Sequence, residues 1–297
     1  MFLRFLALIC ALICLFVLGA SHFGALHPLG DSLAVFRGGL AIVGAVAVLV
    51  LVLQRRLLLA VLGAGLVLWS AYTVLAPRFT FSAALDTPYA LYQKNMSFRM
   101  PDTGPLAADI LQQAPDFVTL EEVDRENLAL LAALKPDYPA QAFCPFMNVG
   151  GVAVASRWPK VAGSDVCLQG QGMVAMQVET PEGPVWVVAL HLHWPYPHGQ
   201  AAQVRGLETA LKALEGPVVL GGDFNMVPWS HTMQAITSAT KTRRIGAPKY
   251  TFPLFDGLYT LPIDHVLVNR NSRPAETERR PQLGSDHFGL LARFYLR

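Results

Sequence analysis

Charge is almost absent from the first quarter of this 297-residue chain, and that shortage limits what the segment can fold into. Residues 1–76 hold five charged side chains: Arg4, Asp31, Arg37, Arg55 and Arg56. Three apolar stretches, at residues 5–20, 38–53 and 57–76, approach or reach the roughly 20 residues that cross a bilayer as a helix. Because backbone groups in lipid must be satisfied within their own segment, we expect three transmembrane helices in an anchor at residues 1–78.

Two other interpretations of the apolar stretches are weaker. A helical hairpin buried in a soluble protein would show a polar face, and none of the three stretches has one. A cleaved signal peptide would end at Leu18-Gly19-Ala20, where leucine is too large for the position three residues before the cut. We therefore expect the first helix to remain in the chain.

The arginines predict how the chain is oriented in the membrane. Arg55 and Arg56 fill the short turn between the second and third helices, and the positive-inside bias places this turn in the cytoplasm. Arg4 agrees, whereas Arg37 and Arg78 disagree mildly. We therefore expect a multi-pass protein of the inner (cytoplasmic) membrane, with residues 79–297 outside the cytoplasm, in the periplasm of a two-membrane bacterium. The lipid bilayer is the expected partner, and no protein partner is predicted.

Residues 79–297 have the composition of a globular domain that is large enough to bury its own core. They carry 18 Lys and Arg against 20 Asp and Glu, so the strong basic excess of many nucleic-acid-binding domains is missing. From Lys241 onward, ten basic residues accompany five acidic ones. That local excess is either an ordinary solvated surface or a basic rim beside an acidic metal pocket.

Apolar periodicity in this second segment predicts a mixed α/β fold. Helical spacing predicts helices at residues 106–113, 125–134 and 201–214. Runs rich in Val, Leu and Ala predict strands at residues 117–120, 151–155, 173–178, 185–190, 218–220 and 263–268. This order of elements fits two sheets packed face to face, with helices outside them.

The four cysteines are too few for a disulfide scaffold. Cys10 and Cys14 lie in the first apolar stretch, where they are expected to be small apolar residues. Cys144 and Cys167 flank an apolar strand pair and would be able to pair in an oxidising compartment. The sequence leaves that pairing open.

Polar motifs follow the ends of the predicted strands, where sites are usually built. Two of them are informative alone: Gly222-Asp223-Phe224-Asn225, and the Ser-Asp-His run that contains Asp286 and His287. The remaining candidates would each, taken singly, be a turn, cap or surface residue, and they are Asn95, Glu122, His191 and Asp264. Their order along the chain is more informative than any one of them.

In this order, the motifs resemble the endonuclease/exonuclease/phosphatase superfamily. That superfamily includes deoxyribonuclease I, abasic-site endonucleases, inositol polyphosphate 5-phosphatases and bacterial-type sphingomyelinases. The resemblance covers residues 89–294 and is closest in style to bacterial members with N-terminal membrane helices. It implies a four-layered α/β sandwich, a catalytic domain at residues 79–297, and phosphoester hydrolysis that depends on a divalent metal.

The resemblance implies which residues hold the metal. Glu122 matches the metal-binding glutamate of the family, and Asp286 is the second carboxylate near the ion. Asn95 would hold a metal-bound water or a phosphoryl oxygen. Mg²⁺ suits these oxygen ligands, because it is hard and binds through few carboxylates while keeping its waters. Mn²⁺ is the alternative ion.

The resemblance also implies the catalytic residues. His287 would contact the scissile phosphate, oriented by the carboxylate of Asp264. Asp223 would align the attacking water, and Asn225 would donate to the phosphate. His191 would contact the phosphate or assist the leaving group. A water nucleophile, a cation and donors to the developing charge are what phosphoester hydrolysis needs.

Three features of the sequence test this interpretation. The pair His191 and His193, with His198 nearby, would suggest zinc, but the Asp-His of the dinuclear zinc pattern does not follow them. His193 and His198 are therefore expected to be rim or structural residues. Glu121 stands where the family has Gln, and the extra charge would either attract a second cation or face solvent. Phe288 follows the Ser-Asp-His motif, which leaves a less polar wall near the phosphate.

The substrate is the least determined property. Nucleic acid is the first expectation, as for a phosphodiesterase or endonuclease, because Trp194, Tyr196 and Trp229 would be able to stack on bases. These aromatic residues are equally candidates for the core, and the core is the better expectation for Trp229. A lipid phosphodiesterase of the sphingomyelinase type is the alternative, because the anchor and a short tether after Ala76 would place the site near headgroups. A phosphatase acting on a soluble phosphomonoester is a third possibility, and an inactive scaffold would require a lost catalytic position, of which there is none.

Overall fold

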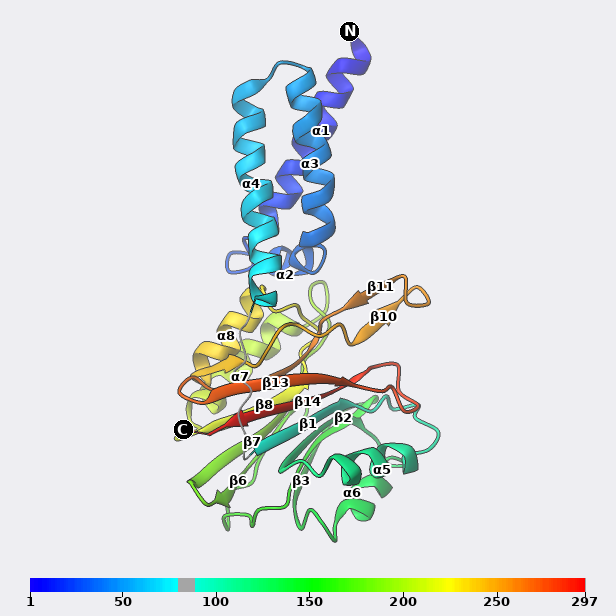
Figure 1. The fold of residues 1–297 in the computed structure, drawn as a ribbon, viewed down its shortest axis with the longest axis vertical. Coiled ribbons are helices and arrows are strands. Elements are labelled where there is room, and N and C mark those ends of the chain that lie inside the picture. The colour runs from blue at the N-terminus through cyan, green and yellow to red at the C-terminus, as the bar shows by residue number, and fades with distance from the viewer. Residues whose placement is uncertain (80–88, 297) are drawn as a thin grey trace.

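The computed structural model describes residues 1–79 and 89–296, and it has two parts stacked along one long axis (Figure 1). A head of apolar helices forms one end, and an α/β body forms the other. The expected tether after Ala76 falls largely on residues 80–88, which lie outside the described residues.

The head contains α1 (Phe2–Ala20), α3 (Arg37–Leu53) and α4 (Leu57–Leu75). Small residues let the three helices pack closely, because a Cβ on Gly63 would lie 2.8 Å from Leu15 Cδ1. Their outer faces expose large apolar side chains, among them Leu68 on α4. Two of the described helices, α1 and the one that runs from Leu57 to Arg78, are long and apolar enough to cross a membrane. A third span results if α3 and the helix before it, bent by 81°, are counted as one.

A short helix that the sequence did not predict joins the head to the body. This helix, α2 (Pro28–Val35), begins at His27, whose ring accepts from the backbone N–H of Leu29, with Pro28 at its first position. It lies between the spans and the body (Figure 1). At the end of α4, the 3-10 turn η1 (Ala76–Arg78) lies at the same level.

The body is built on two six-stranded sheets. The first has the order β13 (Arg273–Arg280), β14 (Gly289–Tyr295), β1 (Tyr89–Asn95), β2 (Phe117–Val123), β4 (Gly150–Ser156) and β3 (Ala140–Met147). The second has the order β5 (Val166–Leu168), β6 (Met173–Thr180), β7 (Gly183–His191), β8 (Val218–Asp223), β12 (Asp264–Asn269) and β9 (Thr242–Arg244). A separate hairpin, β10 (Phe252–Leu254) and β11 (Tyr259–Leu261), projects at the end of the body nearest the head (Figure 1).

Three apolar layers hold the body together. The two sheets pack face to face through side chains such as Leu91 and Val187. The outer face of the first sheet is covered by α5 (Gly104–Gln113) and α6 (Ala129–Leu134), and that of the second by α7 (Gln200–Lys212) and α8 (His231–Ala239). The predicted four-layered α/β sandwich is therefore confirmed.

Two local details go beyond or differ from the prediction. The helix predicted at residues 125–134 begins only at Ala129, because Asp124 Oδ1 accepts the N–H of Asn127 at 2.8 Å and the chain turns there instead. Cys144 of β3 and Cys167 of β5 form a disulfide that joins the two sheets. The pairing that the sequence left open is thus made in the structure.

Candidate active site

The register of the strands gathers the predicted residues at one end of both sheets. In the second sheet, β7, β8 and β12 place His191, Asp223 and Asp264 in one row across the strands. In the first sheet, β1 and β2 run parallel and place Asn95 beside Glu121. Strand pairing therefore aligns Asn95 with Glu121 in one sheet, and His191 with Asp223 and Asp264 in the other.

Asp223 is the centre of this group. Its Oδ2 accepts from Asn95 Nδ2 at 3.0 Å, and its Oδ1 accepts from the backbone N–H of Asn225 at 2.8 Å. The Nε2 atoms of His191 and His287 lie 3.7 and 3.8 Å from Asp223 Oδ2. Burial and the nearby charge of Asp264 raise the pKa of Asp223 to about 7. A carboxylate with such a pKa is suited to accept a proton near neutral pH.

His287 is held as a cation between two carboxylates. Its Nδ1 lies 2.9 Å from Asp264 Oδ2, and Phe252 packs on its ring at 4.6 Å between centroids. Burial opposes the charge, but Asp264 and Asp223 outweigh it and raise the pKa of His287 to about 9. Asp264 is buried as well, yet the interaction with His287 holds its pKa below the ordinary value. The His287 imidazolium, paired with Asp264, can therefore donate a proton or a charge-assisted hydrogen bond into the pocket.

His191 has the opposite electrostatic setting. Burial, with the charge of His287 nearby, lowers its pKa to about 3, so its ring is neutral at physiological pH. Its Nδ1 is buried and has no hydrogen-bond partner among the described residues. The two histidines beside Asp223 are therefore chemically different, one cationic and one neutral.

Glu122 owes its position to a break in the strand. It has φ +58°, and the pairing of β2 with β4 shifts at this residue. Gly150 permits the bulge, because a Cβ there would lie 2.7 Å from the backbone carbon of Val123. Glu122 Oε1 accepts from Asn95 Nδ2 at 3.1 Å, and Oε2 accepts from the N–H of Phe98 at 3.0 Å. Burial raises the pKa of Glu122.

The pocket has a volume of about 340 Å³. Six of the eight predicted site residues line it: Glu122, His191, Asp223, Asn225, Asp286 and His287. The other two, Asn95 and Asp264, stand directly behind them and bond to Asp223 and His287. All eight side chains therefore surround one cavity.

The oxygen atoms of the pocket fit a hard divalent cation. Glu122 and Asp286 are far apart in the sequence, but both line the pocket with a carboxylate. Asp286 is exposed. Asn225 Oδ1 is buried and has no hydrogen-bond partner among the described residues, so it is a free acceptor in the wall. A second group, Asp223, Asp264 and His287, has ligand atoms within 4.8 Å of one another. In that group His287 Nδ1 is already bonded to Asp264, which leaves the Glu122 side as the better position for Mg²⁺.

Two of the three sequence features that tested the interpretation are the extra histidines and Phe288. His193 and His198 line the mouth of the pocket, and neither belongs to the metal-capable group found among the described residues. Phe288 does not line the pocket, and its ring instead lies under the guanidinium of Arg279 at 4.1 Å.

Glu121, the third feature, is fully buried and does not face solvent. Its Oε2 accepts from Gln93 Nε2 at 2.7 Å, and the same nitrogen donates to Asp264 Oδ1 at 2.9 Å. Burial raises the pKa of Glu121 well above its ordinary value and so favours the neutral acid, which is close in shape to glutamine. The departure from the family pattern is thus small in chemical terms.

Two supporting residues were not predicted. Gln93, on the inner face of β1, links Glu121 to Asp264. Lys94, on the other face, donates from its buried Nζ to the carbonyls of Pro281, Gln282 and His287. The sequence signal that would have identified both residues is a polar side chain within an otherwise apolar strand.

The aromatic residues proposed for stacking separate into two groups. Trp194 lines the pocket and is exposed, and Tyr196 lies exposed on the same loop. Trp229 is at the joint between head and body, where its Nε1 donates to the carbonyl of Ala34 at 2.8 Å.

Comparison with known proteins identifies the family of the chain. The sequence profile described as the Endonuclease/Exonuclease/phosphatase family matches residues 94–287, which is more than half of the chain. The chain therefore belongs to the endonuclease/exonuclease/phosphatase family. No curated protein sequence matches it significantly.

Solved structures share the fold of the body. An endonuclease/exonuclease/phosphatase from Beutenbergia cavernae DSM 12333 superposes with a TM-score of 0.57 at 21% identity, over 70% of this chain and 71% of that one. TDP2 from D. rerio, in complex with a single-strand DNA product, has a TM-score of 0.57 at 13% identity, over 69% and 98%. A mutant beta toxin from Staphylococcus aureus with bound magnesium ions has a TM-score of 0.51 at 15% identity, over 69% and 99%. At these identities the likeness establishes the fold alone.

Proposed function

We propose that the chain is a membrane-anchored, Mg²⁺-dependent phosphodiesterase. The observation that carries this proposal is the convergence of four carboxylates, two histidines of different charge and two amides at one pocket. Family membership supports phosphoester hydrolysis as the reaction class. A bound Mg²⁺ would neutralise phosphoryl charge, held by Glu122 and Asp286, with Mn²⁺ as a substitute.

The protein groups then have separate tasks. Asp223 orients the attacking water and accepts its proton, which its raised pKa allows. His287, kept cationic by Asp264, donates to a phosphoryl oxygen. Asn225 and neutral His191 supply further hydrogen bonds to the phosphate or the leaving group. Asn95 ties Glu122 to Asp223 and so fixes the metal side relative to the water side.

A phosphodiester at the membrane surface is the substrate that the geometry supports best. The hairpin next to the pocket exposes Phe255 by 77% and Leu258 by 89%, at the end of the body that faces the head (Figure 1). Phe252 at the base of this hairpin lines the pocket. Among the described residues that line the pocket there is no Lys or Arg. Exposed apolar side chains beside the pocket suit contact with a lipid surface.

Nucleic acid, the first expectation from the sequence, is the second candidate. Trp194 and Tyr196 are exposed on the rim loop and offer faces on which bases stack. The TDP2 structure with a DNA product shares the fold. The chain's acidic balance in residues 79–297 weakens this candidate.

One panel of assays tests the reaction and the substrate together. The full-length protein with Mg²⁺ is given bis-p-nitrophenyl phosphate, plasmid DNA, sphingomyelin vesicles and an inositol phosphate. We expect hydrolysis of the generic diester and of vesicles, and loss by about 10²–10⁴-fold in Asp223→Asn and His287→Ala. Activity that survives both substitutions contradicts the proposed mechanism.

Hairpin variants separate the two substrates. Phe255→Ser with Leu258→Ser is expected to reduce hydrolysis of vesicles and to leave bis-p-nitrophenyl phosphate unaffected. Leu111→Ser, an exposed apolar residue on α5, is the matched control. If plasmid DNA is cleaved and vesicles are not, nucleic acid replaces lipid as the substrate.

A further inference from the structure

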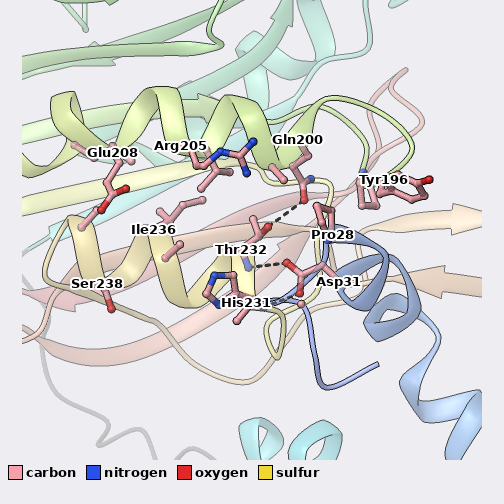
Figure 2. A pocket seen from close by; sticks show the side chains of 18 of the residues that line it. Pro28, Asp31, Tyr196, Gln200, Arg205, Glu208, His231, Thr232, Ile236 and Ser238 are labelled. Carbon is pink, nitrogen blue, oxygen red and sulfur yellow. Dashed lines mark hydrogen bonds between the residues drawn. The ribbon is translucent and has the colours of Figure 1, made fainter. Parts of the chain in front are cut away.

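A cavity of about 470 Å³ lies where the head meets the body, apart from the active site (Figure 2). Helices α7 and α8 form two of its walls, and the segment from Gly24 to Asp31 forms the third. Its apolar lining includes Leu26, Val204, Leu211 and Ile236. This volume is in the range of small-molecule sites, and none of its lining residues lines the catalytic pocket.

The third wall is fixed by specific bonds. Asp31 accepts the backbone N–H groups of His231 and Thr232 at 2.7 and 2.8 Å, so an α2 carboxylate caps the start of α8 (Figure 2). Gly24 packs against that carboxylate, since a Cβ there would lie 2.2 Å from Asp31 Oδ1. The cavity therefore exists only while head and body are docked.

A second groove adjoins the cavity at Leu26. This groove has a volume of about 350 Å³, and its other walls come from the end of α1 and from α2. Phe16, Phe23 and Leu33 are among those walls, and the lining is almost entirely apolar. A bilayer around α1 would fill this groove with acyl chains. Lipid in this groove would reach the cavity at Leu26.

One cation in the cavity wall is free to bind an anion. Lys212 of α7 pairs with Glu208 one turn earlier. Arg205, on the same helix and facing α8 across the cavity, has no ion pair or hydrogen bond among the described residues (Figure 2). A guanidinium binds phosphate oxygens with paired hydrogen bonds.

We propose that this cavity binds one phospholipid from the adjoining leaflet, with an acyl chain between α7 and α8 and the phosphate on Arg205. The proposal rests on the proposed insertion of the head into a membrane. It does not depend on hydrolysis, because the cavity shares no residue with the catalytic pocket.

The test measures lipid retained by the full-length protein. The protein is extracted from vesicles of phosphatidylglycerol and phosphatidylethanolamine, washed in detergent and examined by native mass spectrometry. We expect one retained phospholipid per chain. Val204→Trp and Ala235→Trp, which fill the cavity from opposite walls, should abolish retention. Arg205→Gln should weaken retention by about tenfold, the loss of one charge-assisted hydrogen bond.

Matched controls distinguish the cavity from the rest of the surface. Leu68→Trp adds the same ring to the exposed face of α4, and Lys135→Gln removes one charge at the far end of the body, after α6 (Figure 1). Both should retain lipid like the unaltered protein. Circular dichroism shows whether each tryptophan variant is folded. Because Val204 and Ala235 lie on different walls, the second variant still tests the cavity if the first does not fold.

Two results would overturn the proposal. An unaltered protein that retains no phospholipid would exclude a specific site. Retention that is equal in cavity and control variants would show ordinary surface lipid. Flotation of the unaltered protein with vesicles is scored separately, so a failure of membrane insertion is not confused with a failure of the cavity.

Discussion

Lys94 shows how a single buried charge can hold an active-site loop in place. Its Nζ, at the end of a side chain buried in β1, donates to three carbonyls of the segment that carries Asp286 and His287. Ser285 Oγ adds a bond to the carbonyl of Asn95 at 2.8 Å, so strand and loop are linked twice. Burial lowers the pKa of Lys94 to about 8, with nearby carboxylates opposing that shift. The ammonium is a positioning group, because it bonds backbone rather than lining the pocket.

Replacing Lys94 by Met should therefore destabilise the fold and slow hydrolysis. Met fills a similar volume but leaves the loop carbonyls without donors, which costs about 1.5–3 kcal/mol. Urea unfolding of the full-length protein in detergent measures that loss, and turnover of bis-p-nitrophenyl phosphate measures the effect on the site. Lys135→Met, at an exposed lysine that bonds one carbonyl, should change either quantity little. Equal effects from the two substitutions would remove Lys94 from this role.

At the scale of elements, Asp31 is a helix cap supplied by a different part of the molecule. It belongs to α2 of the head but satisfies two N–H groups at the start of α8 in the body. Trp229 and Arg37 reinforce the joint, because Trp229 Nε1 donates to Ala34 and Arg37 donates to the carbonyl of Trp229 at 3.2 Å. The side chains of Ala34 and Val35 complete the joint by entering the apolar cluster under α7 and α8.

Asp31→Ala should loosen this joint. Loss of a cap typically costs about 0.5–2 kcal/mol, and here it also frees one wall of the cavity. Hydrogen–deuterium exchange should rise at residues 231–234 and in α2. Asp102→Ala removes an equivalent local cap, the bond from the N–H of Gly104 at 2.8 Å, and should raise exchange only at the start of α5. Unchanged exchange at α8 in Asp31→Ala would contradict the proposed coupling.

A second element-scale link joins α5 to the edge of the first sheet. Asp109 bonds Arg280 of β13 and accepts from the hydroxyl of Tyr92 at 2.6 Å. Burial alone would raise the pKa of Asp109, but Arg280 and Tyr92 outweigh it and hold the pKa below the ordinary value. A depressed pKa means that the carboxylate stabilises the fold above its unfolded pKa of about 3.9, and that this stability is lost as pH falls through the folded pKa.

The stability lost in Asp109→Asn should accordingly depend on pH. We expect a deficit of about 1 kcal/mol or less at neutral pH, because the pair is partly screened. The deficit should shrink toward zero as the pH falls through the lowered folded pKa of Asp109. Thermal unfolding of both proteins across this range checks the sign. A deficit that grows at acid pH would contradict the assignment.

Much of the element order and of the site could be predicted, because apolar runs mark the strands and polar site residues follow where those runs end. Asp223 and His191 end short, continuous apolar runs, so both strands and their polar ends were visible in the sequence. By contrast, α2 was not predicted, because it is only eight residues long. It is held by docking on α8, which no local sequence pattern encodes. The role of Glu122 was predicted from the family resemblance, but the bulge that positions it was not, and the roles of Gln93 and Lys94 appeared only with their tertiary partners.

At the scale of the whole molecule, the N-terminus and the body lie at opposite ends of the helical head. Gln54 Nε2 donates to the carbonyl of Arg4 at 3.0 Å, so the N-terminus and the Arg55–Arg56 turn lie at one end of the helices. The body lies at the other (Figure 1). The disulfide Cys144–Cys167 is typical of proteins outside the reducing cytoplasm. Both observations support the proposal that the body is extracytoplasmic.

Cysteine labelling in intact cells tests this orientation. In a chain with Cys10 and Cys14 replaced, Lys135→Cys should react with a membrane-impermeant maleimide that has passed the outer envelope. Arg55→Cys should react only after the inner membrane is permeabilised. The reverse pattern would place the body in the cytoplasm.

The central claim is that one pocket seats a divalent cation beside the scissile phosphate. Hydrolysis of bis-p-nitrophenyl phosphate by the full-length protein, measured against Mg²⁺ concentration, tests it most directly. We predict saturable dependence on Mg²⁺, abolished by EDTA, and a requirement for about 10–100-fold more Mg²⁺ in Glu122→Gln than in the exposed control Glu126→Gln. Hydrolysis that persists in EDTA, or equal Mg²⁺ dependence in the two variants, would contradict the claim.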